Sequence, residues 1–304
     1  MHVVLTGAAG RLGRSIAVHL AAVGHTVTAL DVRYHREPAQ TAGVDFHVAD
    51  LRDPSAIYAH LPGADALIHF GNQPNEHAAP RRQVYHENCV INLHTFEAAV
   101  EVGTPRIVFA SSIQVQSGNR WLTQDNFGTS HLPALPVTGD APPEPSNLYG
   151  LSKLAAEQHL TMLCGLHPEL SAVSLRLPYT SPGPQAPHRV DVEAIRKHRK
   201  RRWSAPIDEC FTWLDIAELG PLLDAILQHA TPGHDVLLPT SNDNLLGWPL
   251  GRIAESFFPG TPLLGDPEVT AQRMSLADNG PITAKYGWSP AALPADQDAV
   301  APTG

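Results

Sequence analysis

A tyrosine and a lysine stand four residues apart in the segment Tyr149-Gly-Leu-Ser-Lys153. On a helix this spacing places both side chains on one face, where the ammonium group would lower the pKa of the phenol. A tyrosine in that state can act as an acid or a base near neutral pH. The pair Ser111-Ser112 precedes this segment and could hydrogen-bond the same substrate oxygen.

A glycine-rich segment near the N-terminus gives these residues a context. Gly7, Gly10 and Gly13 follow an expected strand and open an expected helix, which is the arrangement of a dinucleotide-binding turn. Glycine lets the backbone approach a pyrophosphate, and the helix N-terminus offers free N–H groups. Each motif is weak alone, but together, in this order, they predict hydride transfer at a hydroxyl or carbonyl carbon.

The choice of cofactor depends on the end of the second expected strand. Asp31 is the acidic residue expected about 20 residues after the glycine turn. Its carboxylate would accept hydrogen bonds from the adenine ribose and repel a 2′-phosphate, which favours NAD. Arg33 could instead pair with that phosphate, so NADP stays open as the less favoured cofactor. Asp50-Leu51 could either touch the adenine or cap the next helix.

The elements that must position these residues alternate between strand and helix. The expected strands are 3–5, 27–30, 44–48, 66–70, 106–110, 172–177 and 235–238. The expected helices are 12–24, 53–61, 82–102, 146–166, 214–228 and 248–258. This alternation predicts an α/β fold, a Rossmann-type doubly wound parallel sheet with a small C-terminal substrate-binding region. Ligands of such sheets bind beyond the carboxyl ends of the strands, where all the motifs lie.

The expected division of the chain follows from this pattern. Residues 1–178 should form the dinucleotide-binding domain, to which 212–239 returns. Residues 179–211 and 240–304 should form the smaller substrate-binding region. The proline-rich stretch 113–148 is expected to be a long irregular loop, and the residues from Ala291 onward are expected to be disordered.

Charge and hydropathy exclude several classes of partner. The 304 residues include 21 lysines and arginines against 30 aspartates and glutamates, a net charge of −9, which disfavours nucleic acid. No apolar run approaches the roughly 20 residues of a membrane span, so no membrane partner is expected. The basic run 196–202 is interpreted as a solvated helix face, with an anion-binding edge as the less favoured alternative.

The cysteines and histidines do not form a metal-binding pattern. Cys89, Cys164 and Cys210 show neither metal spacing nor a disulfide framework, and the 17 histidines are scattered. We therefore predict no metal. The first expected strand begins at residue 2 and leaves no room for a signal peptide, so a cytoplasmic location is expected.

Taken together, these segments resemble the extended short-chain dehydrogenase/reductases, also called the NAD-dependent epimerase/dehydratase family. The resemblance covers about the first 220 residues and rests on segments 6–13, 68–71, 109–112, 149–153 and 211–215 with Asp31, Asp50-Leu51 and Asn88. It implies that Tyr149 is the general acid/base, that Ser112 rather than Ser111 is the catalytic serine, and that Lys153 binds the nicotinamide ribose. It also implies that the other cofactor-binding residues are Gly7, Gly10, Arg11, Leu12, Gly13, Asp31, Asp50, Leu51, Phe70, Gly71 and Asn88, with Asn88 supporting the active-site architecture.

The chain departs from the family pattern where substrate is held. Nucleotide-sugar members usually carry an asparagine three residues after the arginine that ends the sixth strand, but here that position is Tyr179. Uronate dehydrogenases, which the chain also resembles, lack this asparagine but have Asn-His where this chain has Ile113-Gln114. The candidate substrate contacts, each of which could equally be structural, are Gln114, Tyr179, Arg189 and Trp213.

The sequence thus predicts an NAD-dependent oxidoreductase or epimerase acting at a secondary alcohol or carbonyl of a sugar or sugar derivative. A nucleotide-sugar epimerase/dehydratase and a uronate-type dehydrogenase are the enzymatic alternatives. A catalytically silent NAD-binding sensor is the alternative from another class, although the complete Ser112, Tyr149 and Lys153 set argues against it. A homodimer is expected through helices 82–102 and 146–166, unless their outer faces are simply solvated.

Overall fold

The structure is a computed structural model that describes residues 1–33, 41–116, 132–181 and 209–292. Its centre is a seven-stranded sheet in the order β3-β2-β1-β4-β5-β6-β9, and every neighbouring pair is parallel. The strands are β1 (His2–Thr6), β2 (Thr26–Asp31), β3 (Val44–Val48), β4 (Ala66–His69), β5 (Arg106–Ser112), β6 (Ser171–Leu177) and β9 (Gly233–Leu237). The predicted Rossmann-type parallel sheet is confirmed.

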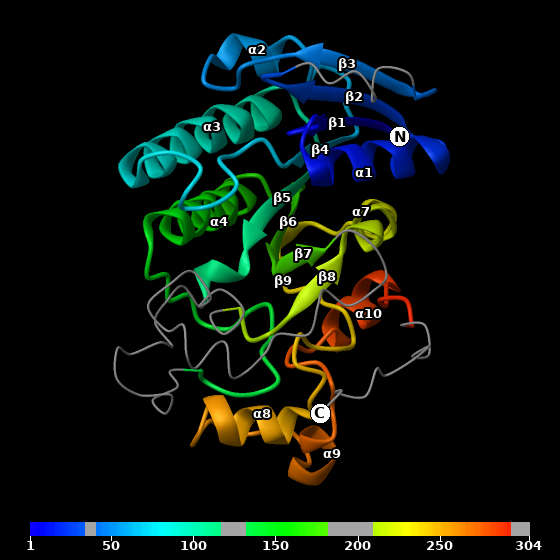
Figure 1. The fold of residues 1–304 in the computed structure, drawn as a ribbon. Helices are drawn as coiled ribbons and strands as arrows, with labels where there is room; N and C mark the ends of the chain where they lie inside the picture. The colour runs from blue at the N-terminus through cyan, green and yellow to red at the C-terminus, as the bar shows by residue number, and fades with distance from the viewer. Residues whose placement is uncertain (34–40, 117–131, 182–208, 293–304) are drawn as a thin grey trace, which may run out of the picture.

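Helices cover both faces of this sheet (Figure 1). One face carries α1 (Arg11–Ala22), α7 (Leu219–Gln228) and α10 (Gly280–Tyr286). The other carries α2 (Pro54–Tyr58), α3 (Arg81–Glu101) and α4 (Leu148–Leu166). No helix of the described residues is both long and apolar enough to cross a membrane.

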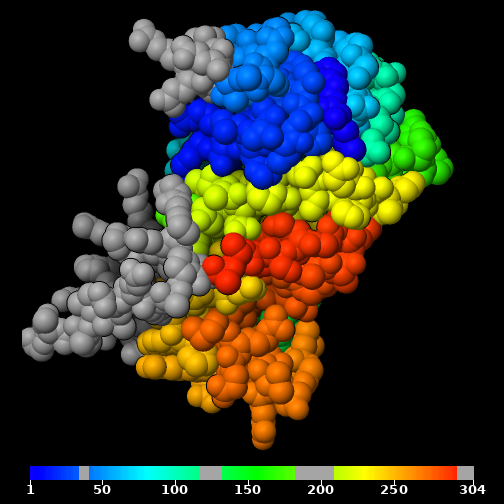
Figure 2. All heavy atoms as spheres, turned by 90° about the vertical axis from the view of Figure 1, so that its right-hand side faces the viewer, coloured from blue at the N-terminus to red at the C-terminus, as the bar shows by residue number. Residues whose placement is uncertain are grey.

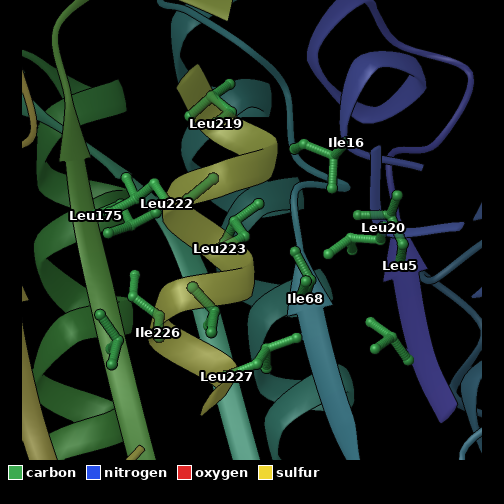
Figure 3. Close-up of a cluster of buried hydrophobic side chains, with 14 of the residues drawn as sticks. Leu5, Ile16, Leu20, Ile68, Leu175, Leu219, Leu222, Leu223, Ile226 and Leu227 are labelled. Carbon is green, nitrogen blue, oxygen red and sulfur yellow. The ribbon is translucent and has the colours of Figure 1, made fainter. Parts of the chain in front are cut away.

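The first core lies between the sheet and α1 and α7. Figure 3 shows Leu222 and Ile226 of α7 beside Leu175 of β6, Leu223 on the side of Ile68 of β4, and Leu20 of α1 beside Leu5 of β1. The leucines and isoleucines of the two helices recur at spacings of three and four, which places them on one helix face against the sheet. Burial of such a side chain contributes about 1.5–3 kcal/mol, so this face fixes where both helices lie.

A separate core holds the C-terminal region. It is built around α8 (Leu250–Phe257) and α9 (Pro267–Ala271) and includes Phe211, Trp213 and Phe257. Leu135 and Val137 join it through isolated bridges to Leu263 and Ala277. Figure 2 shows this region, in orange, beneath the red α10 and the yellow α7. The division of the chain at residue 178 stays a prediction. Ile282 and Tyr286 of α10, which belong to the segment expected in the substrate-binding region, pack in the first core.

Residues 214–228 do not form one helix, contrary to expectation. β8 (Trp213–Asp215) pairs in parallel with β7 (Tyr179–Ser181) in a small second sheet, and α7 begins only at Leu219. The Asp215 side chain accepts a hydrogen bond from the Ala217 N–H, which starts a short 3-10 turn between strand and helix. Pairing with β7 therefore outweighs the helical spacing of this segment.

Other differences lie at element ends. α2 ends at Tyr58 rather than 61, α4 begins at Leu148 rather than 146, and α9 and α10 were not predicted. Ala291 donates its backbone N–H to the Glu218 carboxylate, and the expected disorder beyond residue 292 lies outside the described residues. The basic run 196–202 also lies outside them.

Candidate active site

A cleft of about 840 Å³ runs along the carboxyl ends of the central strands. On the β2 side its lining includes Gly7, Gly10, Arg11, Leu12, Gly13, Asp31, Asp50, Leu51, Phe70 and Gly71. On the β5 and β6 side its lining includes Ser112, Gln114, Tyr149, Lys153, Tyr179 and Glu209. The sequence motifs therefore meet in one site, because parallel strands end at the same edge of the sheet.

The glycine turn is shaped by close backbone contacts. Gly7 has φ of +72°, and a Cβ there would lie 2.5 Å from the Phe70 carbonyl oxygen. A Cβ at Gly13 would lie 2.2 Å from the Gly7 carbonyl oxygen. In the described structure no side chain caps α1 at Gly10, and the residues of its first turn line the cleft. This arrangement fits a pyrophosphate.

Asp31 ends β2 with its carboxylate held by the backbone. One carboxylate oxygen accepts from the Ala9 N–H at 3.0 Å and the other from the Arg33 N–H at 3.2 Å. The side chain is thus fixed at the cleft, where a ribose diol could donate to its remaining lone pairs. The Arg33 side chain also lines the cleft.

Asp50 does not cap α2. Asp53 does so, accepting from the Ser55 N–H at 2.9 Å. Asp50 instead forms an ion pair with Arg52, with N–O distances of 2.9 and 2.6 Å, and this hydrogen bonding lowers the pKa of Asp50. Asp50 and the buried Leu51 both line the cleft, as the adenine-contact hypothesis requires.

Ser112 and Tyr149 come together from β5 and α4. The α4 helix starts at Asn147, whose side chain accepts from the Gly150 N–H at 2.7 Å and so fixes the first turn that carries Tyr149. Ser112 and Tyr149 both line the cleft, and the Ser112 hydroxyl lies near enough to the phenol to lower its pKa, against the effect of burial. Ser111 differs, because its hydroxyl donates to Glu157 at 2.5 Å. The two serines thus have separate surroundings, and it is Ser112 that lies near the phenol.

Lys153 is buried and tied to the sheet. Its Nζ donates to Asn72 Oδ1 at 2.8 Å and to the Ala110 carbonyl at 2.7 Å, and it lies 5.6 Å from the centre of the Tyr149 ring. Burial lowers the pKa of Lys153 to about 7. The lysine is therefore only partly charged at neutral pH.

The expected lowering of the Tyr149 pKa is wrong for this arrangement. Burial raises the pKa of Tyr149 to about 12, the Ser112 hydroxyl opposes this, and the charge of Glu209 adds to the rise. Lys153 directs its ammonium to Asn72 and Ala110 rather than to the phenol. Tyr149 is consequently protonated at neutral pH.

A buried polar chain connects Lys153 to the first strand, and the sequence motifs did not predict it. Asn72 donates to Asn92 at 2.9 Å, Asn92 contacts His69 at 3.0 Å, and His69 contacts Thr6 at 2.7 Å. Burial lowers the pKa of His69 to about 3, so this imidazole is neutral and serves as a structural hydrogen-bonding group.

Glu209 is the second residue that the motifs missed. It lines the cleft, is partly exposed, and lies near the Gln114 side chain and the Tyr179 backbone. Burial raises its pKa to about 7. A glutamate outside every motif gives no sequence signal of its own, and only the fold brings it to Tyr149.

The remaining candidates lie in different places. Gln114 and Tyr179 line the cleft. Trp213 does not, because it is fully buried in the C-terminal core, and Arg189 lies outside the described residues. Asn88 is also buried away from the cleft lining. It donates to Ser152 of α4 at 3.1 Å and accepts from the Gln73 N–H at 2.8 Å, which supports the active-site framework. The described residues contain no cluster of metal-ligating side chains.

Comparison with known families agrees with this geometry. The sequence model of the NAD dependent epimerase/dehydratase family matches residues 3–236. The chain belongs to this family. It is therefore an NAD-dependent enzyme of the oxidoreductase and epimerase type, with NAD as its cofactor, and its glycine turn and Asp31 fit that cofactor.

The individual proteins that this chain resembles share a third or less of its residues over the aligned segments. The uronate dehydrogenase of Pseudomonas syringae pv. tomato is 28% identical over 245 residues, which cover 81% of this chain and 76% of that protein. The NAD-dependent glucose-6-phosphate dehydrogenase of Haloferax volcanii is 33% identical over 185 residues, 58% of this chain and 67% of that protein. The crystal structure of a UDP-glucose 4-epimerase from Bifidobacterium longum, with NAD+ and UDP, has a TM-score of 0.66 at 18% identity, covering 96% and 94% of the two chains, and shows the shared fold.

Proposed function

We propose that this chain catalyses NAD-dependent oxidation, reduction or epimerisation at a secondary alcohol or carbonyl of a sugar or sugar derivative, through Ser112, Tyr149 and Lys153. The observation that carries the proposal is that Ser112, Tyr149 and Lys153 line the same cleft as the glycine turn and Asp31, with Ser112 near enough to the phenol to affect its pKa. A silent NAD-binding sensor has no use for this set, so the enzyme is favoured.

The residues divide the chemistry as follows. Bound NAD supplies the hydride acceptor or donor and, when oxidised, a positive charge on its ring. Ser112 and Tyr149 hold the reacting oxygen by hydrogen bonds. The protonated phenol donates to a carbonyl oxygen in the reductive direction, and in the oxidative direction it must first lose that proton, which nearby positive charge favours. Lys153 Nζ donates to Asn72 and to the Ala110 carbonyl, and its remaining N–H donates to the ribose of the cofactor.

The sugar class of substrate is supported by the relatives. Those most similar in sequence are named for uronate, glucose 6-phosphate and arabinose, which share a polyhydroxylated carbon chain but differ in charge. The cleft agrees with such a substrate because polar groups of Gln114, Tyr179 and Glu209 surround Tyr149.

Replacing Tyr149 by Phe tests the proposal. The phenol oxygen is removed while the ring and its packing remain, so turnover should fall at least about a hundredfold, as expected for loss of general acid/base catalysis. The affinity for NAD, measured by calorimetry, should change little. Turnover is followed on a panel of neutral and acidic sugars, and product analysis separates net oxidation from epimerisation. A wild-type protein that binds NAD but converts no sugar would favour the sensor.

The assembly and location that we propose are a homodimer in the cytoplasm. α3 and α4 pack side by side on one face of the sheet. Their outward apolar residues are Leu93, Leu151, Met162 and Leu166, and such side chains are typical of a helical interface. None of the three cysteines forms a disulfide, in agreement with a reducing compartment, and the negative net charge supports the absence of a nucleic-acid partner.

A further inference from the structure

Glu209 occupies the substrate side of the cleft without a role in the proposed chemistry. It lies near enough to Tyr149 for its charge to raise the pKa of the phenol. It shares the cleft lining with Gln114, Tyr149 and Tyr179. A carboxylate placed beside the reacting oxygen of a sugar is positioned to meet the rest of that sugar.

The side chain is held in place by its neighbours. Gln114 and the Tyr179 backbone lie near enough to the carboxylate to favour its ionised form, and Gln114 in turn accepts from Asn147 at 2.8 Å. Asn147 is the residue that caps the catalytic helix. Gln114 therefore lies between Glu209 and the residue that fixes the first turn of the catalytic helix.

The backbone after Glu209 adopts an uncommon conformation. Cys210 and Phe211 both have φ of +53°, in the left-handed region that non-glycine residues rarely occupy. Both side chains are fully buried in the C-terminal core, and the Glu209 carbonyl accepts from the N–H and the hydroxyl of Thr212 at 2.9 and 2.6 Å. This turn sends two neighbours into the core and leaves Glu209 at the cleft. Such conformations are strained and concentrate at functional sites.

The carboxylate still has acceptor capacity. An ionised carboxylate offers about four lone-pair sites, and Gln114 and the Tyr179 backbone lie near enough to occupy some of them. The remaining sites suit hydroxyl donors. A second anion would be repelled, and Lys153, which burial leaves only partly charged, already donates to Asn72 and Ala110.

We propose that Glu209 contacts the substrate, accepting hydrogen bonds from hydroxyl groups of an uncharged sugar and excluding sugars that bring a carboxylate or phosphate to this position. This inference rests on the proposed function and deepens it by naming the substrate class. It separates this chain from its relatives named for uronate and glucose 6-phosphate.

Binding to the NAD-loaded, full-length protein tests the inference. Galactose and galacturonate form one matched pair, and glucose and glucose 6-phosphate form another. At about pH 8, where Glu209 is charged, the wild type should bind each neutral sugar at least about tenfold more tightly than its anionic partner. Glu209→Gln keeps the shape of the side chain but removes its charge. It should therefore weaken the binding of the neutral sugar and reduce the ratio of the two affinities to near unity. Calorimetry gives all four dissociation constants.

Two further variants make the result specific. Glu255→Gln removes an exposed carboxylate on α8 and should leave the preference unchanged. Glu209→Asp keeps the charge, so it should retain the preference while binding neutral sugars more weakly. A wild type that prefers the anionic sugars, an unchanged preference in Glu209→Gln, or no binding of any of the four sugars would overturn the inference.

Turnover of the same sugars separates this inference from the proposed function. Binding with the expected preference but without reduction of NAD or epimerised product refutes the proposed function and leaves Glu209 as a contact residue. If Glu209→Gln changes the turnover of neutral and anionic sugars by the same factor, the role of Glu209 is refuted and the Ser112 and Tyr149 chemistry stands.

Discussion

Individual ionisable groups in this cleft are displaced from their usual charge states by burial. Lys153 and Glu209 both have pKa values near 7, although one is lowered and the other raised. Tyr149 between them is displaced to about 12. Burial acts in opposite directions on acids and bases because it always disfavours the charged form. The consequence is a site whose charges respond to modest changes in pH and to bound ligands.

The raised pKa of Glu209 predicts a pH-dependent stability. The Glu209 carboxyl has a pKa of about 7 in the folded protein and about 4.5 in the unfolded chain, so between these pH values the folded state binds more protons. The free energy of unfolding should therefore fall as the pH rises through this window. Glu209→Gln removes the effect and should be more stable than the wild type by about 1–2 kcal/mol at pH 8 but not at pH 5, after allowance for partial exposure. Urea unfolding at both pH values measures this. A constant difference between the two would contradict the raised pKa.

Asp31 sets the cofactor preference at the same scale. Its carboxylate, fixed by the N–H groups of Ala9 and Arg33, should repel a 2′-phosphate. NADP should therefore bind at least about tenfold more weakly than NAD, a difference of about 1.4 kcal/mol. Asp31→Asn should narrow this gap, since it removes the charge at nearly constant size. Equal affinities in the wild type, by titration, would mean that Arg33 dominates.

At the scale of elements, α4 is joined to β6 by a buried ion pair. Glu157 bonds to Arg176 at 2.8 and 3.1 Å and also accepts from Ser111 of β5. The guanidinium further donates to the carbonyls of Gly139 and Ala141. The ion pair and the Ser111 hydrogen bond together fix the catalytic helix to β6 and to β5, the strand that carries the serines.

Breaking this ion pair should destabilise the protein strongly. Glu157→Leu leaves a buried guanidinium without its carboxylate and should cost about 3–5 kcal/mol in the free energy of unfolding. The double variant Glu157→Leu/Arg176→Met removes both charges and should recover much of that loss. Urea unfolding of the wild type, Glu157→Leu, Arg176→Met and the double variant measures these changes in the free energy of unfolding. If the double variant is as unstable as the sum of the singles, the pair is not coupled.

The outer faces of α3 and α4 carry the prediction about assembly. Val84, Phe96, Leu160 and Leu163 of these two helices are buried within the chain and are not available to a partner. Leu93 and Met162 remain, each about half exposed. Leu93→Glu and Met162→Glu should shift a dimer to a species near the 32.7 kDa chain mass in sedimentation at micromolar concentration. A wild type that already sediments at this mass would exclude the dimer.

The sequence predicted elements well where periodicity and packing agree. The strands around β1, β5 and β6 and the helices α1, α3 and α4 were expected within a few residues of their ends. Residues 214–218 were misjudged because Leu-Asp-Ile-Ala-Glu also fits a helical spacing, and the pairing of β8 with β7 depends on residues over 30 positions away. Local patterns do not contain that information.

For the whole molecule, the two sides of the cleft were unequally predictable. The cofactor side is a local motif, and its glycines and Asp31 line the cleft as expected. The substrate side is assembled from β7, the turn at Glu209–Phe211 and α4, which are distant in sequence. Glu209 was missed and Trp213 was assigned to the cleft rather than the core for this reason. The same inequality explains why the family is clear from sequence and the substrate is not.

The chain of side chains behind Lys153 also limits what this lysine can do. An ammonium group has three protons. Asn72 and the Ala110 carbonyl take two of them, and both acceptors are themselves fixed, one by Asn92 and the other within β5. A single direction is left for donation. Lys153 can therefore donate a hydrogen bond to the ribose or to the phenol at a given moment, but not to both. Its effect on the site is directional.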